Sequence, residues 1–307
     1  MAFLTIFTTP KPFTNPHIAT IQGNALANWQ ALGADVAVIV LGDESGAAEA
    51  ATDYGALHLP EVARNAAGTP LISDLFEQAR AHADGPLLAY VNADILLLPD
   101  FVDTARLALQ KCKEFLLVGQ RWDLDVTEPL AFDSGWEANL HQRVQQDGSL
   151  HPPAGSDYFI FPREAYREMP EFAIGRAGWD NWMIYQARRK GWPTIDATNS
   201  IFIVHQNHDY SHLPDGQPHY RLPETYENVR LAGGYRTIFT LADTNYKLVN
   251  GQIRNSDMPL KKILREIETF PQRRLNSTPL ANLTYSIFHP IKAYRDFRGW
   301  LNKGKVR

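Results

Sequence analysis

Two polar side chains follow an apolar run of the sequence near position 90. The run 87–91 (LLAYV) is typical of a buried strand, and Asn92 and Asp94 come directly after it. Because they stand two positions apart, both side chains point to the same side of an extended chain. A carboxylate released at the end of such a strand can hold Mg²⁺ or Mn²⁺ against a diphosphate. The alternative is that both residues only cap a helix that starts near Pro99.

Three of the ten histidines lie within the segment 205–212 (HQNHDYSH), which follows the strand-like run 200–204 (SIFIV). Their spacing differs from a helical zinc motif such as His-Glu-x-x-His, and at least one of the three is expected to be a structural loop residue. The single cysteine, Cys112, excludes an intramolecular disulfide and a thiolate metal cage. Any metal site must therefore use oxygen and imidazole ligands.

Other polar residues stand where expected strands or helices begin. Arg64 and Asn65 precede a helix, where a guanidinium, an amide and free helix N-terminal N–H groups suit an anion. The alternative for Arg64 is a surface arginine that fixes a loop. Asp157 begins a strand-like run, where a carboxylate is also a common turn residue. Asp180 lies in the first turn of a helix after Gly178, where the helix dipole favours a negative charge.

An alternation of strands and helices must position these residues. Apolar runs alternate with amphipathic segments, and helices are expected over 18–32 and 71–83. Asn15 and Gly33 mark the two ends of the first of them. This βαβ order predicts a mostly parallel central sheet with helices on both faces. From about 120 to 215, short strands are expected between loops rich in Trp, Asp, His and Gly, which indicates a substrate-facing region.

The composition is that of a folded protein of enzyme size. The chain has 307 residues, of which 44% are hydrophobic. Its formal net charge of -4 argues against nucleic acid as a partner. The first residues lack the basic start of a signal peptide, and no run of eighteen apolar residues occurs. We therefore expect a cytoplasmic protein.

The C-terminal part differs in charge from the rest of the chain. Residues 250–307 hold twelve Lys/Arg and four Asp/Glu, a local balance of +8, which leaves -12 for residues 1–249. The last 23 residues mix Phe, Tyr and Trp with Lys and Arg, a composition that suits contact with the inner surface of a membrane. The alternative is a terminal helix that packs on the core and leaves its basic face in water.

The order of these features resembles the GT-A superfamily of nucleotide-sugar glycosyltransferases over roughly residues 3–210. In that superfamily a strand ends in an Asp-x-Asp-type motif whose last acid is usually the metal ligand, and here the motif reads Asn92-Ala93-Asp94. The resemblance implies an α/β, GT-A-like (Rossmann-like) fold with a mostly parallel central sheet flanked by helices and a C-terminal helical extension. It also implies a nucleoside-diphosphate sugar donor, an acceptor hydroxyl, and Mn²⁺ or Mg²⁺ as cofactor.

The resemblance also gives roles to residues on the nucleotide side. It implies contacts to the base or ribose from Thr8, Thr9 and Asp43. It implies contacts to the diphosphate from Arg64, Asn65, Asn92 and Asp94. For the metal it implies Asp94 and a histidine after the late strand, which is His205, with His208 as the second candidate.

Further roles follow for the sugar side of the same resemblance. Ser156 and Asp157 occupy the place of donor-sugar contacts. Trp179 and Asn181 stand at the place of donor-sugar or acceptor contacts, where Trp182 could also stack on a sugar ring, with both tryptophans in the core as the alternative. Asp180 matches the general base that removes the proton of the acceptor hydroxyl in inverting enzymes.

We therefore expect a catalytic domain over 1–215, with a nucleotide-binding half over 1–100 and a donor-sugar and acceptor half over 101–215. Residues 216–307 would form a C-terminal extension with a basic tail. The expected activity is an inverting sugar transfer to a hydroxyl of a glycan or a lipid-linked acceptor. Two alternatives stay open, a binding protein for carbohydrate or nucleotide-sugar without catalysis, and a sugar-nucleotide pyrophosphorylase. The segment after the first strand lacks the Gly-rich loop of the latter class.

Overall fold

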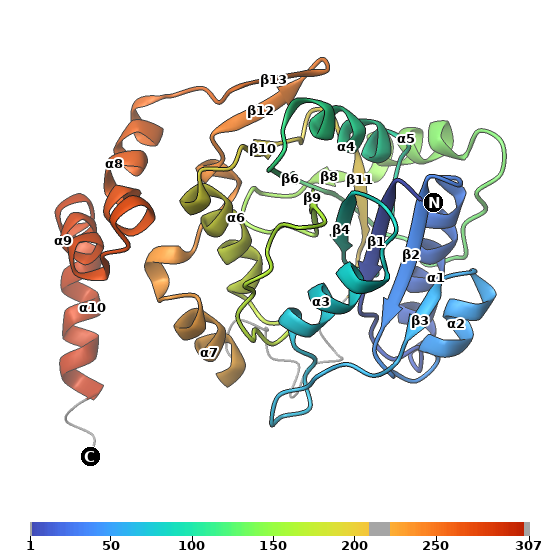
Figure 1. Ribbon diagram of the computed structural model, residues 1–307, viewed down its shortest axis with the longest axis horizontal. Coiled ribbons are helices and arrows are strands. Elements are labelled where there is room, and N and C mark those ends of the chain that lie inside the picture. Colours follow the sequence, from blue (N-terminus) through green and yellow to red (C-terminus); the bar gives the residue numbers. More distant parts are fainter. Residues whose placement is uncertain (1, 209–221, 304–307) are drawn as a thin grey trace.

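The computed structural model describes residues 2–208 and 222–303, and within them nine strands form one large sheet (Figure 1). Five of its strand pairs are parallel and three are antiparallel. In order across the sheet the strands are β3 (Leu57–Leu59), β2 (Val36–Leu41), β1 (Leu4–Thr8), β4 (Leu87–Val91), β9 (Tyr158–Pro162), β6 (Leu116–Val118), β10 (Thr194–Asp196), β12 (Tyr246–Val249) and β13 (Gln252–Asn255). The predicted mostly parallel sheet is confirmed.

Alternate side chains of the strands feed two hydrophobic cores, one on each face of the sheet. Leu4 and Ile6 of β1 join the first core and Phe7 joins the second, as the two-residue period of a strand requires. The first core is covered by α1 (Pro16–Ala31), α2 (Ala47–Asp53) and α4 (Asp100–Lys111). The second is covered by α3 (Ile72–His82) and α6 (Trp179–Lys190). Helices thus flank both faces, as expected from the sequence.

The two helices predicted in the first third of the chain are confirmed. Asn15 caps α1, because its side chain accepts hydrogen bonds from the backbone N–H groups of His17 and Ile18. Gly33 follows the end of this helix with a φ of 97°, a conformation that favours glycine. The helix expected over 71–83 is α3.

A second, four-stranded sheet lies beside the carboxyl end of β4. Its order is β5 (Ile95–Leu97), β11 (Ile203–Gln206), β7 (Trp122–Leu124) and β8 (Ser149–Leu150). Apolar side chains of α5 (Trp136–Asp147) pack on it and form a third core. This sheet positions the site, because β11 pairs with β5 on one side and with β7 on the other.

The C-terminal part continues the large sheet before it leaves it. After α7 (Pro223–Leu231) and the short helices η3 (Tyr235–Thr237) and η4 (Leu241–Asp243), β12 pairs in parallel with β10. This edge of the large sheet is therefore built from strands later in the chain than residue 222.

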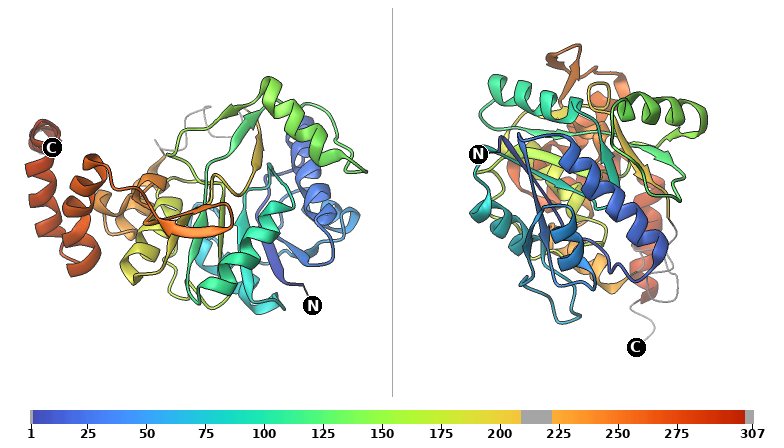
Figure 2. Two further views of the ribbon diagram at one scale, coloured as in Figure 1. Left: turned by 90° about the horizontal axis from the view of Figure 1, so that it is seen from above. Right: turned by 90° about the vertical axis from the view of Figure 1, so that its right-hand side faces the viewer.

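The last three helices form an arm at the side of the body, as Figures 1 and 2 show. The arm consists of α8 (Leu260–Leu275), α9 (Thr278–Phe288) and α10 (Pro290–Lys303), so the expected helical extension is present. None of the helices in the described ranges has both the length and the apolar character that crossing a membrane would need.

Candidate active site

A cavity of about 670 Å³ opens at the carboxyl ends of β1 and β4. Ligands of open α/β sheets bind at this edge, and the volume suits a small-molecule site. Its lining includes ten of the residues singled out in the sequence: Thr9, Arg64, Asn92, Asp94, Ser156, Asp157, Trp179, Asp180, His205 and His208. The structure thus gathers residues from widely separated segments around one space.

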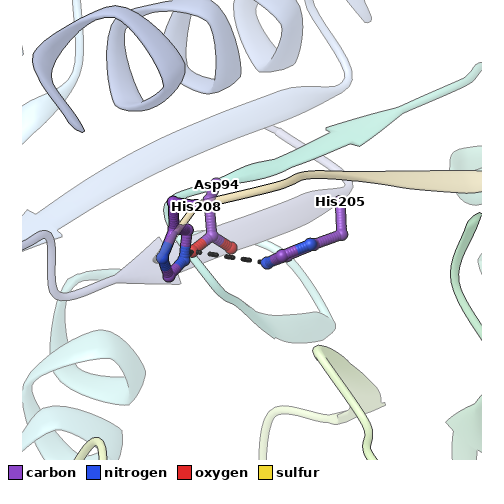
Figure 3. A group of neighbouring side chains, drawn as sticks. All are labelled: Asp94, His205 and His208. Carbon is purple, nitrogen blue, oxygen red and sulfur yellow. Dashed lines mark hydrogen bonds and ion pairs between the residues drawn. The ribbon is translucent and has the colours of Figure 1, made fainter. Parts of the chain in front are cut away.

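Asp94, His205 and His208 lie together in this cavity (Figure 3). The Oδ2 atom of Asp94 is 3.0 Å from Nε2 of His208 and 4.0 Å from Nε2 of His205. One ligand atom from each residue can be chosen so that all three lie within 4.8 Å of one another. Strand pairing explains the arrangement, since His205 of β11 stands opposite Ile95 and the N–H of Gln206 donates to the carbonyl of Asp94 at 3.1 Å.

The charge state of this cluster fits a divalent cation. Burial alone would raise the pKa of Asp94, but His208, His205 and Lys11 outweigh it and lower this pKa, so Asp94 is a carboxylate at neutral pH. Its Oδ1 atom is buried and has no hydrogen-bond partner among the described residues. A buried carboxylate oxygen without a partner, next to two imidazoles, is the donor set that a cation would complete.

Asp123 of β7 orients His205 from the other side. The two residues stand opposite each other in the β7–β11 pair, and Asp123 Oδ1 is 3.5 Å from Nδ1 of His205. Asn207 Oδ1 lies 3.3 Å from the same nitrogen. When Nδ1–H faces this carboxylate, the lone pair of Nε2 is directed toward Asp94. Burial lowers the pKa of His205, while Asp123 and Asp94 raise it, and the net shift is upward. The sequence reasoning missed Asp123.

Arg121 connects Asp123 to Asp157, and it too was not among the residues predicted from the sequence. Its Nε donates to Asp123 at 2.8 Å, and its Nη1 donates to Asp157 Oδ1 at 2.6 Å. His151 Nδ1 lies 2.6 Å from the second oxygen of Asp123. The signal in the sequence was an Arg and an Asp on either side of Trp122, at the start of a short strand.

Asn92 holds Asp157 in place. The backbone N–H of Asn92 donates to the carbonyl of Asp157 at 3.0 Å, and its side-chain Nδ2 donates to Asp157 Oδ1 at 2.9 Å. The hydroxyl of Tyr90 donates to Asn92 Oδ1 at 3.1 Å. The amide of Asn92 is therefore engaged at both ends, whereas Oδ2 of Asp157, a residue of the cavity lining, is buried without a hydrogen-bond partner among the described residues.

Cationic side chains line another part of the cavity. Lys11 Nζ is 3.7 Å from Asp94 Oδ2 and 3.0 Å from His208 Nε2, and this lysine was missed as a site residue. Arg64 donates to Gly68 at 2.8 Å and pairs with Asp43 and with Glu44, the latter at 3.1 Å. Such cations suit the phosphates of a nucleotide.

Asp180 lies in the first turn of α6, where it lines the same cavity. Its Oδ1 accepts a hydrogen bond from the N–H of Gly178 at 3.2 Å. Burial raises the pKa of Asp180 to about 6, although backbone N–H groups at the helix start partly oppose this shift. The adjacent Trp179 is mostly buried and packs edge-to-face on Tyr90 with ring centroids 4.9 Å apart.

Several predicted residues do not line the cavity. Asn65 uses its amide within its own loop and toward Glu224 at 2.7 Å, and Asn181 donates to the carbonyl of Phe239 at 2.7 Å. Asp43 reaches the site only through Arg64, and Thr8 is buried in the sheet. Trp182 packs in the second core. His212 lies outside the described residues.

No protein-family model and no curated protein matches the sequence. Among solved structures, the chain is similar to a mannosyltransferase from Pyrobaculum calidifontis in complex with GDP-Man and Mn²⁺, with 16% identity and a TM-score of 0.43. This match covers 68% of the chain and 58% of the mannosyltransferase, so the chain spans less than two thirds of that protein.

Two further structures show a similar likeness. Glucosyl-3-phosphoglycerate synthase from Mycobacterium tuberculosis, in complex with Mn²⁺, UDP and glucosyl-3-phosphoglycerate, has 16% identity and a TM-score of 0.46, over 84% of this chain and 88% of that one. S. aureus TarS in complex with UDP-GlcNAc has 10% identity and a TM-score of 0.45, over 93% of this chain and 80% of TarS. These values describe a distant likeness, so the chemistry below rests on the residues of this chain.

Proposed function

We propose that the protein is a metal-dependent glycosyltransferase that moves a sugar from a nucleoside-diphosphate sugar to an acceptor hydroxyl with inversion. The observation that carries this proposal is the Asp94–His205–His208 cluster at the carboxyl end of the sheet, with a buried carboxylate oxygen that no described residue satisfies. Cationic side chains and Asp180 line the same cavity. This arrangement supports an anionic leaving group and a base for the acceptor in one space.

Asp94, His205 and His208 would hold the cation. Two imidazoles make this donor set softer than the all-oxygen surroundings that Mg²⁺ prefers, which favours Mn²⁺ of the two ions. When bound, the cation would neutralise charge on the departing diphosphate. Asp123 would keep His205 in the tautomer that presents Nε2 to the cation.

The diphosphate would lie against Lys11 and Arg64. Both side chains line the cavity, and Lys11 already stands next to the carboxylate of Asp94. Arg64 would turn part of its guanidinium from Asp43 and Glu44 to phosphate oxygens, with which it can form two parallel hydrogen bonds. These two residues would select a donor with a charged leaving group.

Asp157 and Asp180 would act on the two reacting sugars. The free Oδ2 of Asp157 can accept a hydrogen bond from a donor-sugar hydroxyl, while Arg121 and Asn92 hold Oδ1. Asp180 would take the proton of the acceptor hydroxyl as its oxygen bonds to the anomeric carbon. The bond from that carbon to the diphosphate breaks, and its electron pair leaves with the phosphate. One displacement of this kind inverts the anomeric centre.

Turnover of nucleotide-sugars by the full chain tests this proposal. We expect hydrolysis or transfer with at least one member of a panel of UDP-, GDP-, ADP- and dTDP-sugars in the presence of Mn²⁺, and loss of turnover in Asp94→Ala and in Asp180→Ala. Unchanged turnover in both variants would show that the site is elsewhere. Binding without turnover would favour a binding protein, and an NMR spectrum of fresh product with retained configuration would exclude inversion.

A further inference from the structure

The C-terminal arm turns its apolar side chains outward. On α8 they recur at the spacing of one helix face, with Leu260 exposed to 70%, Ile267 to 52% and Phe270 to 49%. Further apolar side chains are exposed on α9 and α10: Leu280, Leu283, Ile287, Ile291 and Tyr294. So many exposed apolar side chains on three consecutive helices of a folded protein indicate a binding partner.

The opposite face of α8 is polar and turned toward the protein. Glu266 lies 2.8 Å from the buried Arg188 of α6 and 2.6 Å from Arg273 of its own helix. Arg265 reaches Asp243 at 2.8 Å, and Glu268 lies 3.2 Å from His289. These ion pairs fix the rotation of α8, so the helix cannot turn its apolar face inward without breaking them. The outward apolar face is therefore built into the fold.

The exposed charges described on these three helices are of one sign. Among the side chains of α8–α10 whose exposure is described, the exposed charged residues are all basic: Lys261, Arg274, Lys292, Arg295 and Arg298. The acidic residues with described exposure in these helices, Glu266 and Glu268, are half-buried or buried and held in ion pairs. Apolar side chains accompanied by basic ones complement a surface that has an anionic outer layer and an apolar interior.

We propose that the arm docks this face on an anionic lipid surface, with the apolar side chains of α8, α9 and α10 between the headgroups and the basic residues on lipid phosphates. A second copy of the chain fits less well, because pairing the same face with itself would bring basic residues against basic residues. The surface shares no residue with the cavity of the active site. The docking can therefore be tested apart from the proposed activity.

Co-sedimentation of the full chain with vesicles tests the proposal. The vesicles are of phosphatidylcholine alone, or of phosphatidylcholine with phosphatidylglycerol. We expect binding to the anionic vesicles, weakened by salt, and weak binding to the neutral ones. The pair Ile267→Gln and Leu283→Gln should lower the partition coefficient at least roughly tenfold. The pair Lys292→Gln and Arg295→Gln should lower it by about tenfold or more on anionic vesicles only.

A matched control is available outside the arm. Tyr226 on α7 is exposed to 58%, so Tyr226→Gln removes a comparable apolar side chain and should leave vesicle binding unchanged. Circular dichroism and nucleotide binding should be unaltered in all variants, which separates this docking from the proposed activity. Equal binding to neutral and anionic vesicles, or equal losses in the control and arm variants, would overturn the proposal. Absence of vesicle binding would also overturn it, and a dimer in light scattering that the apolar variants dissociate would then identify a second copy as the partner.

Discussion

Burial sets the protonation state of Asp180, the residue that we assign as base. Its pKa is raised to about 6, so the carboxylate holds its proton below that pH and is free to accept one above it. A raised pKa also makes the carboxylate a stronger base than an exposed aspartate. We therefore expect kcat/KM to rise with pH through about 6 and then to level, measured with Mn²⁺ and donor in excess.

The substitution Asp180→Asn keeps the size of the side chain and the acceptor for the Gly178 N–H. We expect kcat to fall by roughly 10²–10⁴ with little change in donor affinity, and the rise near pH 6 to vanish. Asp103→Asn on α4, an exposed carboxylate outside the cavity lining, serves as the control. A variant that keeps the pH profile of the wild type would rule out Asp180 as the base.

In the proposed site Asp123 acts on the cation through His205. We expect Asp123→Asn to weaken Mn²⁺ binding by about 10–100-fold, because the neutral amide loses the negative charge that makes His205 a more basic ligand. Electron paramagnetic resonance of free Mn²⁺ measures this directly. Asp133→Asn is the control, since Asp133 is an exposed carboxylate outside the cavity lining. If the two variants bind Mn²⁺ with equal affinity, Asp123 has only a structural role.

At the scale of elements, local patterns were sufficient to predict the βαβ order and the strand that releases Asp94. Apolar periodicity and caps act within one segment, so α1 and α3 could be placed to within a few residues. The neighbours of His205 could not be found in this way. Asp123 lies 82 positions earlier in the chain, and only the pairing of β7 with β11 brings the two together.

Residue type alone also does not show which partner a polar side chain takes. Asn65 and Asn181 have side chains suited to ligands, yet nearby backbone groups and Glu224 already occupy them. A side-chain amide is satisfied by whichever partner the fold brings within reach, and the sequence does not show this partner. The same limit applies to Lys11, which becomes a site residue only because the loop after β1 passes beside Asp94.

The start of α6 depends on the backbone of Gly178. This residue has φ 111°, and an added Cβ would meet Asn228 and Val229 at ordinary contact distances, so the cost of Gly178→Ala is backbone strain. We expect a loss of about 1–3 kcal/mol in the free energy of unfolding. Relief of this strain would also displace the side chain of Asp180, which lies two positions after Gly178, so kcat should fall as well.

A second glycine separates these two effects. Gly33 also has a positive φ, 97°, with nothing within 4 Å of an added Cβ, and it does not line the cavity. Gly33→Ala should lower stability in urea unfolding but leave initial rates unchanged. If both variants lose kcat alike, the start of α6 has no special part in positioning the base.

At the scale of the whole molecule, the arm is held to the body by charge. Arg188 of α6 is buried and meets Glu266 of α8, so Glu266→Gln leaves a buried guanidinium with a weaker partner. We expect a loss of roughly 1–3 kcal/mol in the free energy of unfolding and faster proteolysis between α8 and the body. Glu164→Gln, in an exposed pair with Arg167, should cost less than about 1 kcal/mol. Equal losses would mean that the pair with Arg188 does not anchor the arm.

In the proposed function the cluster of Asp94, His205 and His208 holds the cation, and through it the diphosphate, at the edge of the sheet. Calorimetric titration of nucleoside diphosphates tests this directly. UDP, GDP, ADP and dTDP are titrated into the full chain with Mn²⁺, into the same protein with EDTA, and into Asp94→Ala with Mn²⁺. We predict that at least one nucleotide binds with Mn²⁺, and that its affinity falls at least roughly tenfold with EDTA and in the variant. Binding that is equal in all three conditions, or no binding of any of the four, would contradict a metal-dependent nucleotide site at Asp94.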